Sequence, residues 1–527
     1  MDVAHDKART LSRKSLAILS LPIVTGNGAV RNVNVALGQM LGHLCGFNYK
    51  QKTISQFLAE LKYLGISSHL LRELPRFWQE VWGQDVSKIP GPVLCYYVDG
   101  NTKAVWSSKR VKKNKVTMFG KVMGCLEQVF IHDGLGHPVY FETYSGRAPV
   151  GEYILGLFEK IESSIQEVPR SKTQVCRAIV MDGASNSVGT LRAFEAQNKY
   201  HYITTLDDNQ WSERRVRSRS YPARYLYGDA FLRDLEYELE DSQEKGYLIV
   251  ARAIQINWDN GKQTILLTSL PKTKIDSSEV VYSYFRRWPA QELSFRHKKA
   301  ATCLNRVSGY GKKQVANERV QKTQEKLTLK KSRLESELKE PMSAIADYDR
   351  MLERLIPEER RLRAQTSIKK GKRTAAPTLR KKYEMCGEKI RNIERAKKEI
   401  EKAHAKSFRS HRKTQKEWLR LQGKETEYQL DVELDQILTY FRASLAHLYA
   451  YFIKHFLDGE PISMVMLIHR VLHLQANVEE TAQERKVTLH ANWKDRTMME
   501  KLERAITKLN NLSIRGNGGL VYRFILT

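Results

Sequence analysis

The chain has 527 residues, 41% of them hydrophobic, and a formal net charge of +29. This length exceeds what one hydrophobic core usually supports, so we expect two to four structural units, and the hydrophobic content excludes a disordered chain. The positive charge favours a polyanionic partner such as a nucleic acid, although it would also suit a ribosomal or membrane-surface protein. The six cysteines form no Cys-x2-Cys pair, which indicates neither a zinc site nor a disulfide framework and fits a reducing cytosol.

Residues 1–90 are expected to form an N-terminal helical region that binds DNA. Helices over 54–64 and 70–82, separated by Gly65, have the spacing of a helix-turn-helix. The alternative is a plain helical hairpin with a buried apolar face, which spacing alone favours. The apolar stretch 16–24 is too short to span a bilayer, so we expect no membrane partner.

Short apolar runs replace the helical pattern between residues 91 and 206. The expected order is strand, strand, strand, helix, strand, helix, strand, over 93–98, 120–131, 139–142, 152–165, 178–181, a helix that ends at 196, and 200–205. A turn at Asp133–Gly136 joins the second and third strands, and Ser185 or Asn186 can cap the second helix. This is the order of an RNase H-like core, so we expect an α/β fold whose first part spans 91–206.

A β-rich insertion is expected over 207–275. The runs 247–258 and 263–270 flank Asp259-Asn260-Gly261, a strong hairpin signal because Asn and Gly tolerate positive φ. A core helix over 276–310 follows the insertion. The simplest arrangement is therefore a core that a β-rich segment interrupts.

The segment 311–425 differs in composition from the rest. Between 311 and 420 there are about 33 Lys and Arg against about 16 Asp and Glu, so more than half of the net charge lies there. Apolar residues at heptad-like spacing form two seams: Val320, Leu327, Leu334 and Leu338, and Leu379, Tyr383, Cys386, Ile390, Ile393 and Ile400. These seams predict two antiparallel helices that form a long, basic coiled-coil hairpin.

The tip of this hairpin is expected near 356–377. A compact basic cluster lies there, suited to DNA phosphates: Lys369, Lys370, Lys372 and Arg373. The alternative, that charges only solvate the outer faces of a coiled coil, is equally strong. Residues 426–527 are expected to add apolar helices over 434–457 and 464–474 and an edge strand over 520–526.

Three acidic residues occupy positions that suit metal ligands. Asp99 ends the apolar run 93–98, and Asp182 follows the run 178–181. Glu292 shares a helical face with Lys299, so the carboxylate can bind a metal while the ammonium holds a phosphate. Taken singly, each aspartate is more often a cap or turn residue. Together, carboxylates that meet at one sheet edge would hold two divalent ions on a scissile phosphate.

The segment around Glu292 resembles the signature of the DDE transposases of bacterial insertion sequences, in particular the group with a Tyr-x2-Arg-x3-Glu-x6-Lys pattern and a β-rich insertion in the core. Tyr284-x2-Arg287 and Glu292-x6-Lys299 keep the family spacing. The interval between the arginine and the glutamate is four residues instead of three. The resemblance covers about residues 50 to 300 and 430 to 527.

The extra residue bears on the expected role of Arg287 more than on that of Glu292. Pro289 lies in the interval and would kink or restart the helix, which could absorb one residue and return Arg287 to the site. Alternatively, Arg286 or Arg296 takes its place.

The resemblance implies a transposase that cleaves the 3′ ends of its element with water and joins the freed 3′-OH to target DNA. Its catalytic and metal-binding residues would be Asp99, Asp182 and Glu292, with two Mg²⁺ ions for which Mn²⁺ can substitute. Its DNA-binding residues would include Tyr284, Arg287 and Lys299. The expected partners are double-stranded DNA, as terminal inverted repeats and as target, and a second copy of the chain, in the bacterial cytoplasm at the nucleoid.

Two other functions compete with transposition. One is an RNase H-like nuclease without joining activity, and the other is a catalytically inactive, transposase-derived DNA-binding protein. In the insertion, Trp211 or Trp258 could contact a base unstacked near the cut, although packing roles are more common for such residues. Nothing in the spacing of Asp207 and Asp208 requires them to be ligands.

Overall fold

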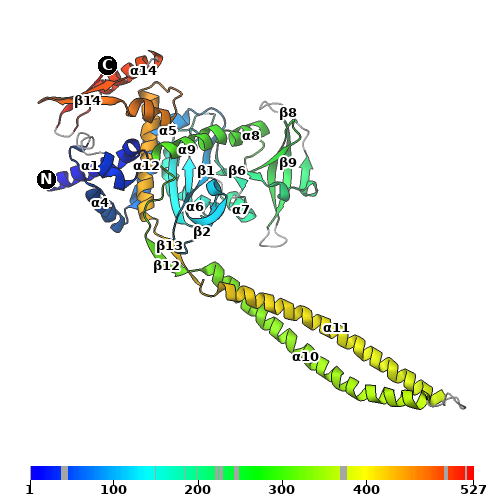
Figure 1. Ribbon diagram of the computed structural model, residues 1–527. Helices are drawn as coiled ribbons and strands as arrows, with labels where there is room; N and C mark the ends of the chain where they lie inside the picture. The colour runs from blue at the N-terminus through cyan, green and yellow to red at the C-terminus, as the bar shows by residue number, and fades with distance from the viewer. Residues whose placement is uncertain are drawn as a thin grey trace. The chain divides into compact units, whose positions relative to one another are not determined.

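The computed structural model describes residues 2–36, 45–148, 150–171, 173–183, 186–197, 199–219, 223–224, 230–241, 248–367, 377–491, 496–516 and 519–527. The chain forms two compact units (Figure 1). One comprises Met1–Lys312 together with Gln429–Thr527, and the other is Lys313–Tyr428. Within the described residues, no helix combines the length and apolar character needed to cross a bilayer.

The larger unit is built on a mixed sheet. Its described strands are β1 (Val93–Ala104), β2 (Lys113–Val116), β3 (Lys121–His132), β4 (Pro138–Ser145), β5 (Cys176–Val180), β6 (His201–Leu206), β7 (Val216–Arg219), β8 (Ala223–Arg224), β9 (Phe231–Glu240), β10 (Leu248–Asn257) and β11 (Gln263–Thr268). Their order is β2-β3-β1-β5-β6-β11-β10-β9-β7, with β4 beside β3 and β8 beside β9. Strands β1, β5 and β6 run parallel, whereas their outer neighbours β3 and β11 run antiparallel to them. The fold is therefore mixed α/β.

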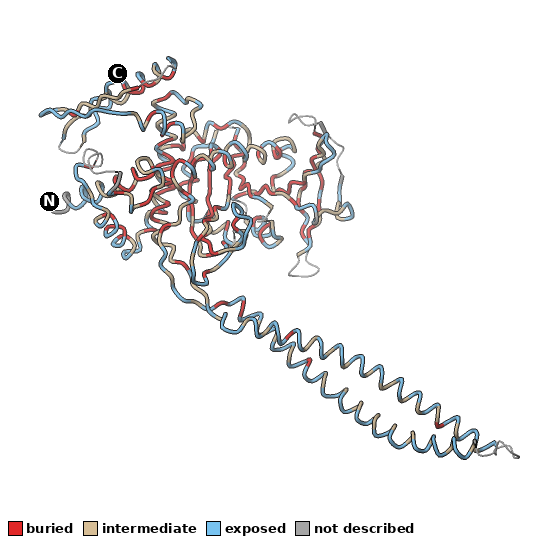
Figure 2. The backbone as a smooth tube through the Cα atoms, in the orientation of Figure 1, coloured by how far each residue is buried: buried red, intermediate tan, exposed pale blue. Residues whose placement is uncertain are grey.

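Helices cover both faces of this sheet (Figure 1). They include α5 (Ser67–Ser87), α6 (Val150–Glu167), α7 (Val188–Ala196), α8 (Ser277–Phe285), the π-helical turn η6 (Trp288–Leu293) and α9 (Ser294–Thr302). Side chains of β1 alternate between two cores, as the pleat of a strand requires. Even-numbered residues from 94 to 98 join a core with α5, α6 and α7, and odd-numbered residues from 93 to 97 join a core with α8. Most buried chain lies in and around the sheet (Figure 2).

Strand β1 is longer than its apolar run predicts. It pairs with β5 only as far as Tyr97 and Val180, but it pairs with β3 as far as Ala104. Asp99 therefore lies inside a strand, just beyond the parallel ladder, and not at the strand end that we expected. Because side chains alternate along a strand, the odd-numbered Asp99 lies on the face of the sheet that packs against α8.

The β-hairpin of the insertion has the expected form. Strands β10 and β11 are antiparallel from Arg252–Thr268 to Asn257–Gln263, and Gly261 has a φ of +76° in the turn between them. The cap expected for α7 was wrong, because Ser187 accepts the N–H of Thr190. Ser185 lies outside the described residues.

The N-terminal helices belong to the larger unit. They are α1 (Asp2–Thr25), the 3-10 turn η1 (Val30–Asn32), α2 (Val33–Ala36) and α4 (Gln51–Tyr63). Both α4 and α5 begin three residues earlier than predicted, and α5 continues to Ser87. The added last turn is explained by Val86, which is fully buried in the core of the sheet together with Leu74, Trp78 and Trp82. The second helix of the expected helix-turn-helix is therefore a core helix.

The C-terminal part adds α12 (Glu433–His455), α13 (Met464–Leu467), the π-helical turn η7 (Ile468–Leu472) and α14 (Arg496–Asn511). It also forms a sheet of β14 (Gln475–Glu480), β15 (Glu484–His490) and β16 (Val521–Leu526). The last strand is an edge strand as predicted, and it runs parallel to β15. Helix α12 shares cores with α1, α4 and α14, so it joins the N-terminal helices to the C-terminal ones.

The smaller unit contains α10 (Glu318–Ser367) and α11 (Pro377–Leu421) and most of the paired strands β12 (Lys312–Ala316) and β13 (Thr426–Leu430). Contacts join Lys331 to Trp418, Glu335 to His411 and Asp349 to Lys397. As the residue number rises along α10, the number of its contact partner on α11 falls, so the two helices are antiparallel. Helix α10 ends at Ser367 and α11 begins at Pro377, so the connection between them falls within the range 356–377 expected for the tip. The basic cluster Lys369, Lys370, Lys372 and Arg373 lies outside the described residues.

A tight turn between β3 and β4 is held by one buried carboxylate. Asp133 Oδ1 accepts the N–H groups of Leu135 and His137, at 2.9 and 2.8 Å, and Oδ2 accepts Trp78 Nε1 at 2.8 Å and lies 3.0 Å from His137 Nδ1. Burial raises the pKa of Asp133, but the charge and hydrogen bonds of His137 and the bond from Trp78 bring it down to about 2. The turn is thereby fixed to α5.

We expect Asp133→Asn to lower the free energy of unfolding at pH 7 by about 2 kcal/mol, because each unit of pKa depression corresponds to about 1.4 kcal/mol. The folded-state pKa is depressed, so this stabilisation is present above the ordinary pKa near 3.8 and is lost as pH falls through about 2. Urea unfolding of both proteins between pH 7 and pH 2 measures it. The difference between them should shrink below about pH 4, and equal stability at pH 7 would contradict the assignment.

Candidate active site

Asp99 and Asp182 occupy matched positions on neighbouring parallel strands. The ladder between β1 and β5 ends at Tyr97 and Val180, and each aspartate lies two residues further along its own chain. Paired strands lie about 4.8 Å apart, so the two backbones leave the ladder side by side. Asp182 is exposed, and its carbonyl accepts the Thr204 hydroxyl at 3.0 Å, which holds it against β6.

The turn that carries Glu292 is π-helical, and a π-helical turn holds one more residue than an α-helical turn. Glu292 lies five positions after Arg287, which in an α-helix would place them about 140° apart around the axis. Here Arg287 Nη2 lies 3.1 Å from Glu292 Oε1. The turn, with Pro289 near its start, thus absorbs the extra residue. Arg287 itself makes this contact, and neither Arg286 nor Arg296 has to replace it.

Gln291 connects this turn to β1. Its Nε2 donates to Asp99 Oδ2 at 2.7 Å, and its Oε1 accepts from Arg287 Nε at 3.3 Å. The side chains of Asp99, Gln291, Arg287 and Glu292 therefore form one continuous polar chain. Sequence reasoning missed Gln291, although the extra residue before Glu292 was a signal that this turn is special.

The surroundings of Asp99 are cationic. Burial raises the pKa of Asp99, while the hydrogen bond from Gln291 and the charges of Arg287 and Lys299 act to lower it. Burial lowers the pKa of Lys299, and the charge of Asp99 opposes that effect. The Lys299 ammonium lies 4.5 Å from the centroid of the Phe295 ring, which fixes it on the helix. Lys299 thus lies within the electrostatic reach of Asp99.

Tyr284 lies one turn before Arg287, in the last turn of α8. It is half-buried, and its ring centroid lies 5.4 Å from that of Phe285. The Tyr97 hydroxyl of β1 donates to the carbonyl of Ser283 at 3.3 Å, which fixes the helix on the strand. The helix is therefore anchored close to Asp99.

The two tryptophans of the insertion have packing partners. Trp211 stacks on Tyr237, with ring centroids 4.9 Å apart. Trp258 donates from Nε1 to the Thr264 hydroxyl at 3.0 Å and contacts Phe285 edge-on. These contacts agree with the packing alternative.

Asp207, for which the sequence required no role, lies beside Asp182. A Cβ atom on Gly183 would lie 3.1 Å from Asp207 Oδ1 and 2.9 Å from Thr205 Oγ1. The glycine after Asp182 is therefore needed for this close approach. The signal in the sequence was the position of Asp207 directly after a strand.

The chemistry of the acidic donors fits magnesium or manganese, which prefer carboxylate oxygens. Among the described residues, no three His, Cys, Asp or Glu side chains form a group ready to hold a metal ion. Asp99 lies inside β1 and Asp182 follows the end of the neighbouring β5, and within the described structure Glu292 is linked to Asp99 through Gln291 and Arg287. For Glu292 to bind a metal ion, its carboxylate must either give up its contact with Arg287 or hold the arginine and the metal ion together.

The comparisons with known proteins give no family. No protein-family model matches the sequence, and no curated protein matches it significantly. Inference about function therefore depends on the residues and their geometry.

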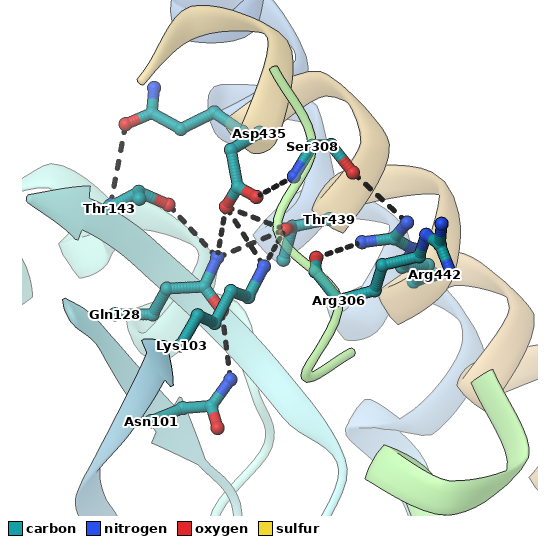
Figure 3. Close-up of polar contacts among 10 residues, drawn as sticks. Asn101, Lys103, Gln128, Thr143, Arg306, Ser308, Asp435, Thr439 and Arg442 are labelled. Carbon is teal, nitrogen blue, oxygen red and sulfur yellow. Dashed lines mark hydrogen bonds and ion pairs between the residues drawn. The ribbon is translucent and has the colours of Figure 1, made fainter. Parts of the chain in front are cut away.

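A buried ion pair fixes the second half of β1. Lys103 Nζ lies 2.9 Å from Asp435 Oδ2 of α12 and 3.0 Å from the Thr439 hydroxyl, and both charged side chains are fully buried (Figure 3). Asn101, on the same face of β1, donates to Gln128 Oε1 at 3.0 Å. Gln128 Nε2 in turn lies 3.1 Å from Asp435 Oδ2. We call the group of Asn101, Lys103, Gln128, Asp435 and Thr439 the buried polar clamp.

The clamp also holds the chain that follows α9. Asp435 Oδ1 accepts the N–H of Ser308 at 2.9 Å (Figure 3). Arg442 donates to the carbonyl of Arg306 at 2.8 Å and to the Ser308 hydroxyl at 3.1 Å. The strand of Asp99 and the chain leaving the Glu292 segment are thus joined through one carboxylate of α12.

We expect Lys103→Met to lower the free energy of unfolding by about 3–5 kcal/mol, because it leaves the Asp435 carboxylate buried and unpaired. Adding Asp435→Asn should recover most of this loss, since the amide oxygen can still accept the Ser308 N–H. Chemical denaturation of the three variants and the wild type measures the coupling. Additive losses in the double variant would show that the two residues do not act as a pair.

Proposed function

We propose that this protein is a DDE-type DNA transposase with an RNase H-like core. The observation that carries the proposal is the polar chain from Asp99 through Gln291 and Arg287 to Glu292, beside an Asp182 at the matched position of the next parallel strand. Two strand carboxylates and one helical carboxylate, near a basic helix, are the groups that metal-dependent phosphoryl transfer needs.

The strand order supports the proposed core. Strands β4, β3 and β1 form an antiparallel meander, and β5 and β6 continue it in parallel with β1. Helix α6 precedes β5, and α7 connects β5 to β6, in the order that the sequence predicted for an RNase H-like fold. Strands β7 to β11 extend the same sheet before the chain returns in α8, which agrees with an insertion into the core.

Each residue of the site has a proposed role. Asp99, Asp182 and Glu292 are the metal ligands. Two bound Mg²⁺ ions would activate the attacking oxygen and stabilise the leaving oxygen of the phosphodiester. Gln291 orients Asp99, and Arg287 neutralises Glu292 in the absence of metal.

Cations around these carboxylates bind the DNA backbone. Lys299 is held on α9 within the electrostatic reach of Asp99, where it can contact a phosphate next to the cut. Arg287, once displaced from Glu292, and Tyr284 provide further phosphate contacts. Such contacts position the strand and do not read its sequence. Water then cleaves the element end, and the freed 3′-OH attacks target DNA, with no covalent enzyme intermediate.

The proposed partner is double-stranded DNA, as element ends and as target. The net charge of +29 supports a polyanionic partner, and a large part of it lies in the hairpin unit. Cleavage of two element ends in one complex favours a homodimer on DNA.

We expect Asp99→Asn, Asp182→Asn and Glu292→Gln each to lower Mg²⁺-dependent nicking of the element ends by more than about 100-fold, because loss of a metal ligand costs several kcal/mol in the transition state. Nicking of supercoiled DNA that carries the sequences flanking the gene measures this. Asp259→Asn, a change of one exposed carboxylate at a hairpin tip, is the matched control and should leave nicking unchanged.

The same assay tests joining. Pre-cleaved ends with free 3′-OH groups should give strand-transfer products with the wild type. Cleavage without such products would replace the proposal by a nuclease. Full activity of all three acid variants would overturn the proposed active site.

We expect the joint replacement of Lys369, Lys370, Lys372 and Arg373 by alanine to weaken DNA binding and to reduce the slope of log affinity against log salt by about 3 to 4, because each phosphate contact contributes about 0.9. Fluorescence anisotropy at several salt concentrations measures the slope. Four exposed cations of α11 form the control set: Lys381, Lys389, Arg395 and Lys402. An equal loss in both sets would show that the hairpin attracts DNA by charge alone.

A further inference from the structure

A surface cavity of about 340 Å³, open to solvent, is lined in part by the π-helical turn. Pro289 and Leu293 of that turn line one side, and Lys298 of α9 lies next to them. The other sides come from the β3–β4 turn, from α12 and from the segment 459–464 that precedes α13. All of these elements belong to the larger unit, and none of the described residues that line the cavity is acidic.

Lys298 is the unusual residue of this cavity. It is only 2% exposed, and its ammonium donates to the Gly136 carbonyl at 2.6 Å and to the Ser294 hydroxyl. An ammonium has three N–H groups, and the described residues offer no acceptor for the third. Burial lowers the pKa of Lys298 to about 8, against the opposing charge of Asp133. A buried cation that contacts only neutral oxygens favours an anion beside it.

The acidic groups near the cavity already have partners. Asp133 is held by His137, Asp85 pairs with Lys454, and the Glu292 carboxylate pairs with Arg287. His137 and Lys454 line the cavity, so its wall also contains an ionisable imidazole and a second ammonium group. The cavity therefore has more cationic than anionic character.

Most of the remaining wall is apolar, with Ser294, His297 and Ser463 as its other polar side chains. Leu293, Ile453, Ile462 and Met464 face a ligand-sized space at the lower end of the usual range for small-molecule pockets. An apolar wall opposite a buried ammonium suits a ligand with a small hydrophobic body and one charged end. A bare inorganic ion would leave the apolar wall without a contact.

We propose that this cavity binds a small oxyanion on an apolar body, either a phosphate ester or a carboxylate, with Lys298 as its main charged contact. The ligand would lie against Pro289 and Leu293, on the turn that also carries Gln291 and Glu292. The proposal does not rest on the DNA chemistry, because binding can be measured without DNA or metal.

Titration of the full-length protein with phenyl phosphate, benzoate, inorganic phosphate and benzyl alcohol tests the proposal by calorimetry or ligand-observed NMR. At least one anion should bind at least tenfold more tightly than the neutral alcohol, and Lys298→Met should weaken that binding about tenfold. Preference for phenyl phosphate identifies a phosphate-ester site, and preference for benzoate identifies a carboxylate site.

Two further variants make the test specific. Lys88→Met removes an exposed lysine away from the cavity and should leave binding unchanged. Ala450→Phe fills the cavity from α12 while Lys298 stays in place, so it should also abolish binding and does not depend on the folding of the lysine variant. Unchanged binding in Ala450→Phe, equal affinity for benzyl alcohol, or equal affinity for inorganic phosphate would overturn the proposal.

Discussion

The buried ion pair between Lys103 and Asp435 is the constraint on which the arrangement of the larger unit depends. It joins residues 332 positions apart, at a place where the described structure excludes water from both charges. Such a pair contributes little net stability by itself, but breaking it is costly because one charge is left buried. Its value here is geometric. Asp435 also accepts the Ser308 N–H, so β1, α12 and the chain after α9 must fit together at one carboxylate.

The site depends on a second, local constraint, the π-helical turn. An α-helical path from Arg287 would carry Glu292 around the axis, away from the arginine. The wider turn restores the contact and leaves Gln291 directed at Asp99. Gly136 shows how closely the support fits. A Cβ atom there would lie 1.8 Å from the Ala290 carbonyl oxygen of the same turn, so only glycine permits the β3–β4 turn to press against it.

Local sequence patterns predicted the helices and strands better than they predicted the contacts between them. The apolar run 93–98, the turn residues at Asp259-Asn260-Gly261 and the heptad seams correspond to β1, to the hairpin of β10 and β11 and to the pair α10 and α11. Boundaries failed where tertiary packing decided them. Burial of Val86 extends α5 beyond residue 82, and pairing with β3 extends β1 beyond Asp99.

The candidate site was predictable only in its charged residues. The spacing of Glu292 and Lys299 and the positions of Asp99 and Asp182 after apolar runs can be recognised in one sequence, because their combination is distinctive although each acid alone is not. The role of Gln291 could not be, since an amide gains its meaning from a partner 192 positions away. The buried polar clamp was not predictable for the same reason, because its partners are far apart in the sequence. Lys103 and Asp435 look like ordinary surface charges in the sequence, and only the fold reveals that each is buried to satisfy the other.

The hairpin unit follows a different principle from the larger unit. Its helices bury few side chains, and polar pairs such as Asp349 with Lys397 and Glu335 with His411 lie between them (Figure 2). These side chains are partly exposed, and ion pairs that flank the seam of a coiled coil set the pairing and orientation of its helices. The two helices therefore need only a narrow apolar seam, and the remaining faces are free to carry charge. A long basic surface is thus obtained without a large core, which is why so much of the net charge can be concentrated in one small unit.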